Sequence, residues 1–157
     1  MFRELERKNK ELTQAECERI LREEKRGVLS VIGDGGYPYG APMNHYYADD
    51  GCIYFLCGKN GHRLDALKNC NKASFCVYNK GEKAENDWAL TVKSVIVFGK
   101  TEIIDDADII ADISARLSRK FTDDEAYIKT EIELYAAETL IIRLKPEHIC
   151  GKRVEEK

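Results

Sequence analysis

The chain has 157 residues, of which 43% are hydrophobic and 34% are charged, a balance typical of one soluble domain with a full apolar core. Its net charge of −3 provides no domain-wide basic field and therefore excludes general nucleic-acid binding. The apolar runs are far shorter than the roughly 18 residues that a membrane-spanning helix needs, so neither a membrane segment nor a signal peptide is expected.

A first helix is predicted over residues 13–26. Thr13 and Glu16 have the spacing of a capping box, in which the two side chains bond reciprocally to backbone N–H groups at the start of a helix. An apolar stripe at helical spacing follows, and Gly27 is the residue type that commonly ends a helix.

The pattern then changes to short apolar runs separated by turns. Strands are predicted over residues 28–32, 37–48 and 52–57, with glycine-rich turns at 33–36 and 49–51. We expect the second of these strands to be kinked by its two prolines, Pro38 and Pro42.

The middle of the chain continues this pattern with one helix and two further strands. We predict a helix over residues 62–70, strands over 73–78 and 88–104, and a polar loop between the two strands. Residues 95–98 are successively apolar, so that part of the long strand should be buried on both faces.

The last third is mostly helical. Helices are predicted within 105–136, the second starting at a capping box formed by Thr122 and Glu125, and a last strand over 138–145 ends at Pro146. Short strands with peripheral helices predict a mainly β, single domain over residues 1–157, with a small closed or partly open antiparallel barrel at 28–104.

The six cysteines give no metal-binding pattern. None belongs to a CxxC pair, and most lie on apolar faces, where cysteine behaves as a small hydrophobic residue. We therefore expect free thiols in a cytoplasmic protein and no metal site. Cys57 has two interpretations, a buried strand cysteine or a thiol of lowered pKa beside Lys59 and a helix start.

The junction between the third strand and the helix at 62–70 is a candidate anion site. Gly58 and Gly61 allow close approach of the backbone, and Lys59, His62 and Arg63 are basic. Free N–H groups at a helix start attract anions, and arginine binds phosphate oxygens in a bidentate manner. The alternative is an ordinary strand-to-helix turn with solvated charges, in which Arg63 pairs with Asp65.

An ordered set of motifs carries a family resemblance. The segments GVLSV at 27–31, GYPYGAPMN at 36–44, DGCIYF at 50–55, GHRLDAL at 61–67 and SVIVFGK at 94–100 resemble the pyridoxamine 5′-phosphate oxidase-like, FMN-binding split-barrel proteins. The similarity extends from about residue 13 to 152 and is greatest to the subgroup of nitroimidazole-resistance proteins.

The resemblance implies a Greek-key split barrel of about six antiparallel strands. It also implies a homodimer that holds FMN at the interface between its subunits. The cofactor-binding residues implied are Met43 and Asn44 beside the flavin ring, Arg63 with Lys59 or His62 at the phosphate, and Ser94 on the long strand. Residues near Trp88, or Lys152, could reach the site of the neighbouring subunit.

One position departs from the family pattern. Many relatives carry a histidine just after the aromatic residue of the third strand, where this chain has Leu56. No catalytic residue is therefore assigned, and His45 and His148 are given no role. Asn44 and Ser94 have an alternative interpretation as polar residues on a solvent face or in a barrel wall.

Three hypotheses about function follow. The first is an FMN-dependent oxidoreductase that passes electrons from a nicotinamide donor, NADH or NADPH, to a small acceptor such as a nitroaromatic. The second is a non-catalytic flavin-binding or sensor protein. The third is a split-barrel dimer that binds another ligand such as haem. True pyridoxamine phosphate oxidation is disfavoured because no second arginine-rich motif is present beyond Arg143 and Arg153.

Overall fold

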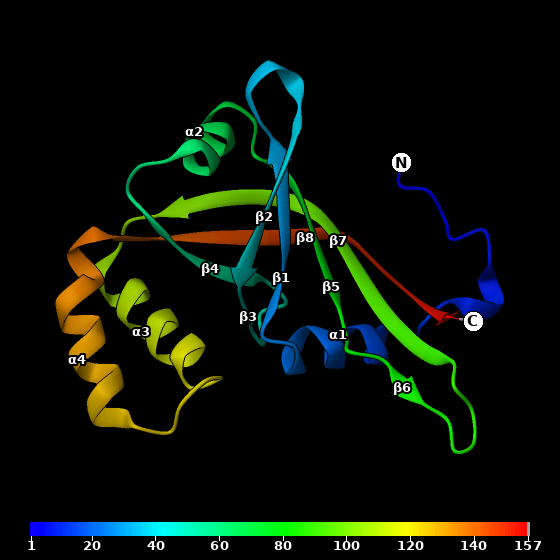
Figure 1. The fold of residues 1–157 in the computed structure, drawn as a ribbon. Coiled ribbons are helices and arrows are strands. Elements are labelled where there is room, and N and C mark those ends of the chain that lie inside the picture. The colour runs from blue at the N-terminus through cyan, green and yellow to red at the C-terminus, as the bar shows by residue number, and fades with distance from the viewer. Residues whose placement is uncertain (157) are drawn as a thin grey trace.

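The computed structural model describes residues 1–156, and its centre is one curled antiparallel sheet (Figure 1). Within these residues the strand order is β2-β1-β5-β7-β8-β4-β3, and β6 pairs with β7. The strands are β1 (Arg26–Ile32), β2 (Pro38–Asn44), β3 (Tyr46–Tyr47), β4 (Ile53–Gly58), β5 (Lys72–Tyr78), β6 (Glu82–Lys83), β7 (Leu90–Ile104) and β8 (Thr139–Glu156). This mainly β split-barrel architecture confirms the predicted fold class.

Helices surround the sheet. They are α1 (Gln14–Glu23), α2 (His62–Asn69), α3 (Ala107–Ser118) and α4 (Glu125–Tyr135), with single 3₁₀ turns at η1 (Lys8–Lys10), η2 (Asp34–Gly36) and η3 (Ala136–Glu138). Helix α2 lies beside the β1–β2 hairpin, whereas α3 and α4 lie together at one end of β7 and β8 (Figure 1). Both termini lie on the side of the molecule opposite α3 and α4 (Figure 1).

The first helix begins as predicted and ends earlier. Thr13 accepts a hydrogen bond from the backbone N–H of Glu16, and the Glu16 carboxylate accepts one from the N–H of Thr13, which confirms the capping box. The prediction that the helix extends to residue 26 was wrong, because β1 already starts there. Gly27 lies within β1, where a Cβ atom would be 2.5 Å from the Phe75 ring, so close strand packing is the reason for glycine.

The predicted second strand is divided at His45 into β2 and β3. These two strands stand at opposite ends of the sheet order but are neighbours in the sequence. Residue 45 is therefore the point at which the chain passes from one edge of the curled sheet to the other. The predicted polar loop after β5 also contains a short strand, β6, so the sheet has eight strands within residues 1–156, two of which have only two residues.

The last strand is much longer than predicted. Pro146 was expected to end it, but β8 continues to Glu156 and pairs with β7 almost throughout. The register shifts between Phe98 and Gly99, where Pro146 lies opposite Gly99 and Glu147 is the extra residue. A bulge accommodates a proline that cannot donate to the ladder. A Cβ atom at Gly99 would be 2.2 Å from the Lys145 carbonyl oxygen, so glycine is required there.

The second predicted capping box was also wrong. Asp124, rather than Thr122, caps α4 by accepting from the N–H of Tyr127 at 3.0 Å. The Glu125 carboxylate instead accepts a hydrogen bond from Arg119 Nε at 2.8 Å, so it does not form the reciprocal bond of a capping box. Helix α3 is capped by Asp106 and contributes Ile110 and Ile113 to a small apolar cluster against β4 and β8.

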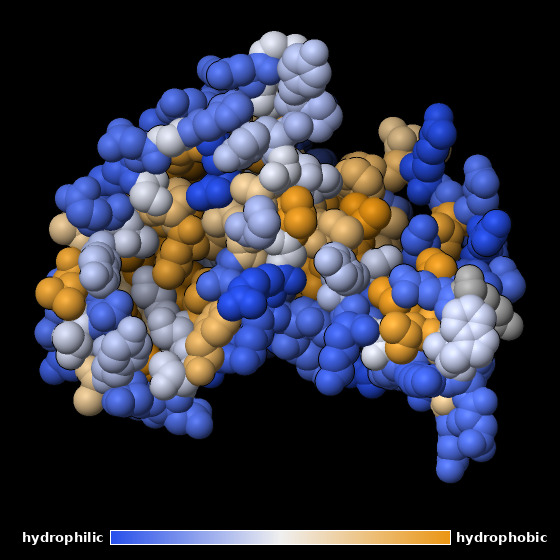
Figure 2. Space-filling view, in the orientation of Figure 1, coloured by the Kyte–Doolittle hydropathy of each residue, from blue (hydrophilic) through white to orange (hydrophobic). Residues whose placement is uncertain are grey.

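The main core lies inside the curled sheet. Alternate residues of β1 and β5 are buried, and the largest fully buried side chains are Phe55 and Phe75, whose rings meet edge to face at 4.9 Å. In the view of Figure 2, apolar residues gather over the central strands, and the outline is mostly hydrophilic, with further apolar residues at its left and right. No helix in residues 1–156 combines the length and the apolar character that crossing a membrane requires.

Candidate functional site

The junction between β4 and α2 forms a small cavity at the start of a helix. Gly61 has φ +134°, a backbone conformation that residues with a side chain rarely adopt. Within residues 1–156, no side chain caps the helix at this point. The first N–H groups of α2 are therefore directed at this space. The cavity has a volume of about 140 Å³ and is lined by Tyr39, Cys57, Gly58, Asn60, Gly61, His62, Arg63 and Leu64.

Arg63 is the main cation of this cavity. Its side chain is partly buried, and its Nε atom is buried with no hydrogen-bond partner within residues 1–156. The alternative pairing of Arg63 with Asp65 does not occur among the described contacts. A buried donor without a partner costs free energy, and Arg63 lines a cavity that can admit an anion beside its guanidinium group.

Cys57 lines the same cavity and is a buried strand cysteine. Burial raises the pKa of its thiol, and the nearby charge of Arg63 lowers it by less. The alternative of a reactive thiol with a lowered pKa is therefore wrong, because the side chain is only 8% exposed and the desolvation of a thiolate outweighs one adjacent cation.

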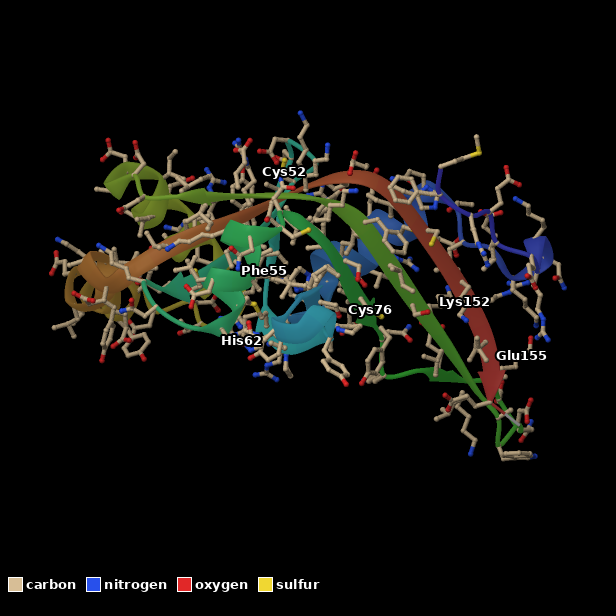
Figure 3. The ribbon with its side chains drawn as sticks, turned by 90° about the horizontal axis from the view of Figure 1, so that it is seen from above. Cys52, Phe55, His62, Cys76, Lys152 and Glu155 are labelled. Carbon is tan, nitrogen blue, oxygen red and sulfur yellow. The ribbon has the colours of Figure 1, made fainter. Side chains whose placement is uncertain are left out.

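His62 connects α2 to the β1–β2 turn. The backbone N–H of Asp34 donates to His62 Nε2 at 3.3 Å, the Asp34 carboxylate is 3.7 Å away, and the Tyr39 ring lies 4.3 Å from the imidazole. Figure 3 shows His62 next to this hairpin. A Cβ atom at Gly33 would be 3.1 Å from Nε2, so the turn fits closely around the ring. Because Nε2 accepts from the Asp34 N–H, a neutral ring carries its proton on Nδ1.

Lys59 lies in the exposed turn between β4 and α2, beside the cavity but not in its lining. The structure thus brings Arg63 and His62 into one cavity and places Lys59 at its rim.

Met43 and Asn44 lie at the other end of β2. Asn44 lies five positions after Tyr39 in the strand, which is about 17 Å at the usual rise per residue. Met43 is buried in the core at 8% exposure, so only its backbone can face a ligand. Asn44 is exposed, and its Oδ1 accepts a hydrogen bond from Arg26 Nε at 3.1 Å.

Ser94 lies on β7, three strands from β2 in the sheet order and thus about 14 Å away along the sheet. It is partly buried and paired in register with Tyr78 and Lys152. In Figure 3, Lys152 of β8 lies far from His62 of α2. One protomer therefore does not gather all six predicted cofactor residues around a single cavity.

Sequence reasoning missed Asp34, which holds His62, and gave no role to His45. His45 is fully buried, and its Nε2 donates to the Leu21 carbonyl at 2.8 Å. Burial lowers its pKa to about 4, with a smaller effect from Lys120. The polar turn sequence after β1 was a usable signal for Asp34, whereas the partner of His45 lies 24 residues away and has no local signal.

Residues 13–153 match the sequence profile of the pyridoxamine 5′-phosphate oxidase family. The chain belongs to this family. No curated protein matches the chain. The residues that match the pyridoxamine 5′-phosphate oxidase family include both the junction between β4 and α2 and nearly the whole curled sheet.

Solved structures share the fold at low sequence identity. A candidate 5-nitroimidazole antibiotic resistance protein from Bacteroides thetaiotaomicron has a TM-score of 0.79 and 17% identity, covering 93% of this chain and 87% of that one. An FAD-binding protein from Mesorhizobium loti has a TM-score of 0.66 and 21% identity, covering 92% and 96%. An FAD and haem binding protein from Mycobacterium smegmatis has a TM-score of 0.71 and 17% identity, covering 91% and 72%.

Proposed function

We propose that this chain is a flavin-binding protein whose cavity at the start of α2 holds the phosphate of FMN, and that it acts as an oxidoreductase. The observation that carries the proposal is the buried Arg63 Nε without a partner, in a cavity at a helix start, within a member of the pyridoxamine 5′-phosphate oxidase family. Solved structures of the same fold that bind FAD support a flavin as the ligand class.

The donor set fits a phosphate. Arg63 offers a guanidinium, the start of α2 offers backbone N–H groups, and Lys59 adds charge at the rim. His62 contributes its Nδ1 proton if the ring keeps its bond to Asp34. These groups are close in sequence, so one short segment supplies the whole anion seat.

The rest of a flavin would lie outside this cavity. Its volume of about 140 Å³ is well below the roughly 300–1,000 Å³ of sites that enclose whole organic ligands. The edge strand β2 leads from the cavity toward Met43 and Asn44, the residues that the family resemblance puts beside the flavin ring. Their backbone groups and the Asn44 side chain would then orient the ring.

A homodimer would complete the site. The outer face of the sheet carries apolar side chains in register beside polar ones such as Ser30 and Ser74. Its apolar members are a partly buried row and a set of exposed residues, namely Val28, Cys76, Ile96 and Cys150 in the row and Ile32, Tyr78 and Phe98 exposed. Exposed apolar faces of this kind commonly bind another protein surface. Ser94 lies on this same face, and so would enter the site only through assembly with a second copy.

The chemistry would belong to the flavin, which when bound accepts a hydride and passes electrons on. The chain's own residues bind and orient: Arg63 neutralises the phosphate, and β2 fixes the position of the ring. Leu56 supplies no proton donor where many relatives have histidine, and the raised pKa of Cys57 keeps that thiol protonated. These features favour an electron-transfer reaction without a protein acid or base.

The deciding experiment is a spectrum and mass analysis of the purified protein, followed by anaerobic titration with NADH and NADPH. We expect a yellow protein that releases FMN, is bleached by a nicotinamide and is reoxidised by a nitroaromatic. A protein that takes up no flavin from micromolar FMN would refute the proposal. Bound flavin that neither nicotinamide reduces would refute the oxidoreductase and identify a flavin carrier or sensor.

Haem is the second candidate ligand, because one solved structure of the same fold binds both FAD and haem. Titration with haemin separates the two ligands. A Soret band that appears at one haem per chain and survives gel filtration would favour haem over FMN, whereas saturable FMN uptake in the presence of haemin would favour flavin.

A further inference from the structure

The passage from β2 to β3, which we call the corner (residues 44–46), is held by groups that the proposed function does not use. The backbone N–H of His45 donates to the Lys25 carbonyl at 3.3 Å, and its ring donates to the Leu21 carbonyl at 2.8 Å. Its carbonyl oxygen accepts a hydrogen bond from Lys120 Nζ at 2.8 Å, whereas its ring atom Nδ1 is buried with no hydrogen-bond partner within residues 1–156.

Lys120 reaches the corner from the end of α3. Its ammonium group also donates to the Glu24 carbonyl at 2.7 Å, so one side chain joins the end of α1, the corner and the end of α3. Burial lowers the pKa of Lys120 to about 8, while Glu24 raises it and Lys25 lowers it. A lysine seldom occupies a partly buried position unless its donors are bonded, and here two of the three donors are bonded to carbonyls.

The neighbouring residues reinforce this junction. Lys25 Nζ lies 5.3 Å from the centre of the Phe121 ring, and the Arg26 guanidinium lies 5.9 Å from it. Arg26 is also the partner of Asn44 through Nε and Oδ1. The chain following α3 therefore contacts the start of β1, and Arg26 links it to Asn44 at the end of β2.

We propose that Lys120 is a positioning residue, which holds the corner and through it the orientation of Asn44 at the ring end of the flavin site. The claim that Lys120 holds the corner is independent of the proposed function. The claim that the corner orients Asn44 toward a flavin rests on the proposed function. Lys120 contacts neither Asn44 nor the cavity at α2, so it acts through the His45 carbonyl. The end of α3 thereby sets the geometry at one end of β2, although α3 and α2 lie on opposite sides of β7 and β8 in Figure 1.

The test is amide hydrogen exchange of the flavin-free protein carrying Lys120→Met. We expect amides of residues 44–47 to exchange at least tenfold faster, while those of β5 keep their rates. Lys129→Met is the matched control, because Lys129 is an exposed lysine of α4 whose nearest acid, Glu133, is 4.0 Å away. Unchanged exchange at the corner, or an equal acceleration in β5, would overturn the proposal.

Two further variants keep the test decisive. Lys120→Gln retains an NH₂ donor on a shorter side chain, and should give an intermediate acceleration if Lys120→Met does not fold.

With FMN, Lys120→Met should weaken binding about tenfold, the scale of one hydrogen bond, and change the flavin absorption bands. Arg63→Ala should weaken binding without altering exchange at the corner. If the wild-type protein takes up no FMN, the proposed function fails, and the exchange data still decide whether Lys120 holds the corner.

Discussion

The two ends of β2 differ in how their polar groups are satisfied. At the end near α2, His62 and Arg63 come from one short segment, are partly exposed, and leave a buried donor without a partner. At the other end, His45 and Lys120 come from distant segments and bond to backbone carbonyl groups, and only His45 Nδ1 among the polar atoms of this pair is buried without a partner within residues 1–156. The first arrangement is suited to receive a ligand, and the second is suited to hold the strand in place. Perturbations at the two ends should therefore have different effects on stability and on ligand binding.

Acidification should reveal the largest difference. The pKa of His45 is about 4 in the folded protein and about 6.5 when unfolded, so the folded state binds fewer protons between these values. The stability from neutral His45 is complete above pH 6.5 and is lost as the pH falls toward 4, by roughly 3 kcal/mol. Urea unfolding at pH 7, 5.5 and 4 measures this. His45→Gln removes the titrating group, and an identical pH slope in that variant would contradict the assignment.

Removing the Lys120 ammonium should destabilise the protein by about 1–3 kcal/mol, because two carbonyl groups lose their donor while the cost of burying a charge is also removed. Lys120→Met is the suitable change, since methionine retains the apolar stem. Chemical unfolding at pH 7 gives the value, with Lys129→Met expected to change it by less than about 0.5 kcal/mol. Equal effects of the two substitutions would show that the buried bonds contribute nothing specific.

Arg63→Ala should affect ligand binding much more than stability, the reverse of Lys120→Met. We expect FMN binding to weaken by about 1.5–3 kcal/mol, the scale of a hydrogen bond to a charged group, with little loss of unfolding free energy. Fluorescence titration of FMN and urea unfolding measure the two quantities on the same preparation. Unchanged FMN affinity would remove Arg63 from the phosphate site.

His62→Ala should produce the smallest effect on stability, about 0.5–1 kcal/mol, because its side chain is 39% exposed and loses one hydrogen bond to Asp34. FMN affinity should fall by less than in Arg63→Ala. Thermal unfolding with and without FMN measures both effects. A larger loss of FMN affinity than in Arg63→Ala would make His62 the principal phosphate ligand.

The local signals in the sequence were sufficient for much of the fold. The capping box at Thr13 and the strand-to-helix change around Gly61 each depend on residues a few positions apart, and the structure has both. The proposed anion seat belongs to the same class, because the glycine, the arginine and the helix start that would form it lie in one segment. The sequence therefore determined the mainly β class, the position of α2 and the place where Arg63 and His62 meet.

Other features were decided by contacts between distant segments. Gly27 is in a strand because the Phe75 ring occupies the space of a side chain, and Pro146 does not end β8 because a bulge opposite Gly99 accommodates it. The burial of His45 and the bonds of Lys120 have the same origin, since their partners lie 24 to 96 residues away. Residue type and spacing determine backbone preference over a few turns. Which backbone carbonyls remain without a backbone donor, and so bond to a side chain such as Lys120, depends on how the sheet curls. The sequence by itself determined the segment on which the proposed anion seat lies, and only the tertiary structure decided what holds the opposite end of β2.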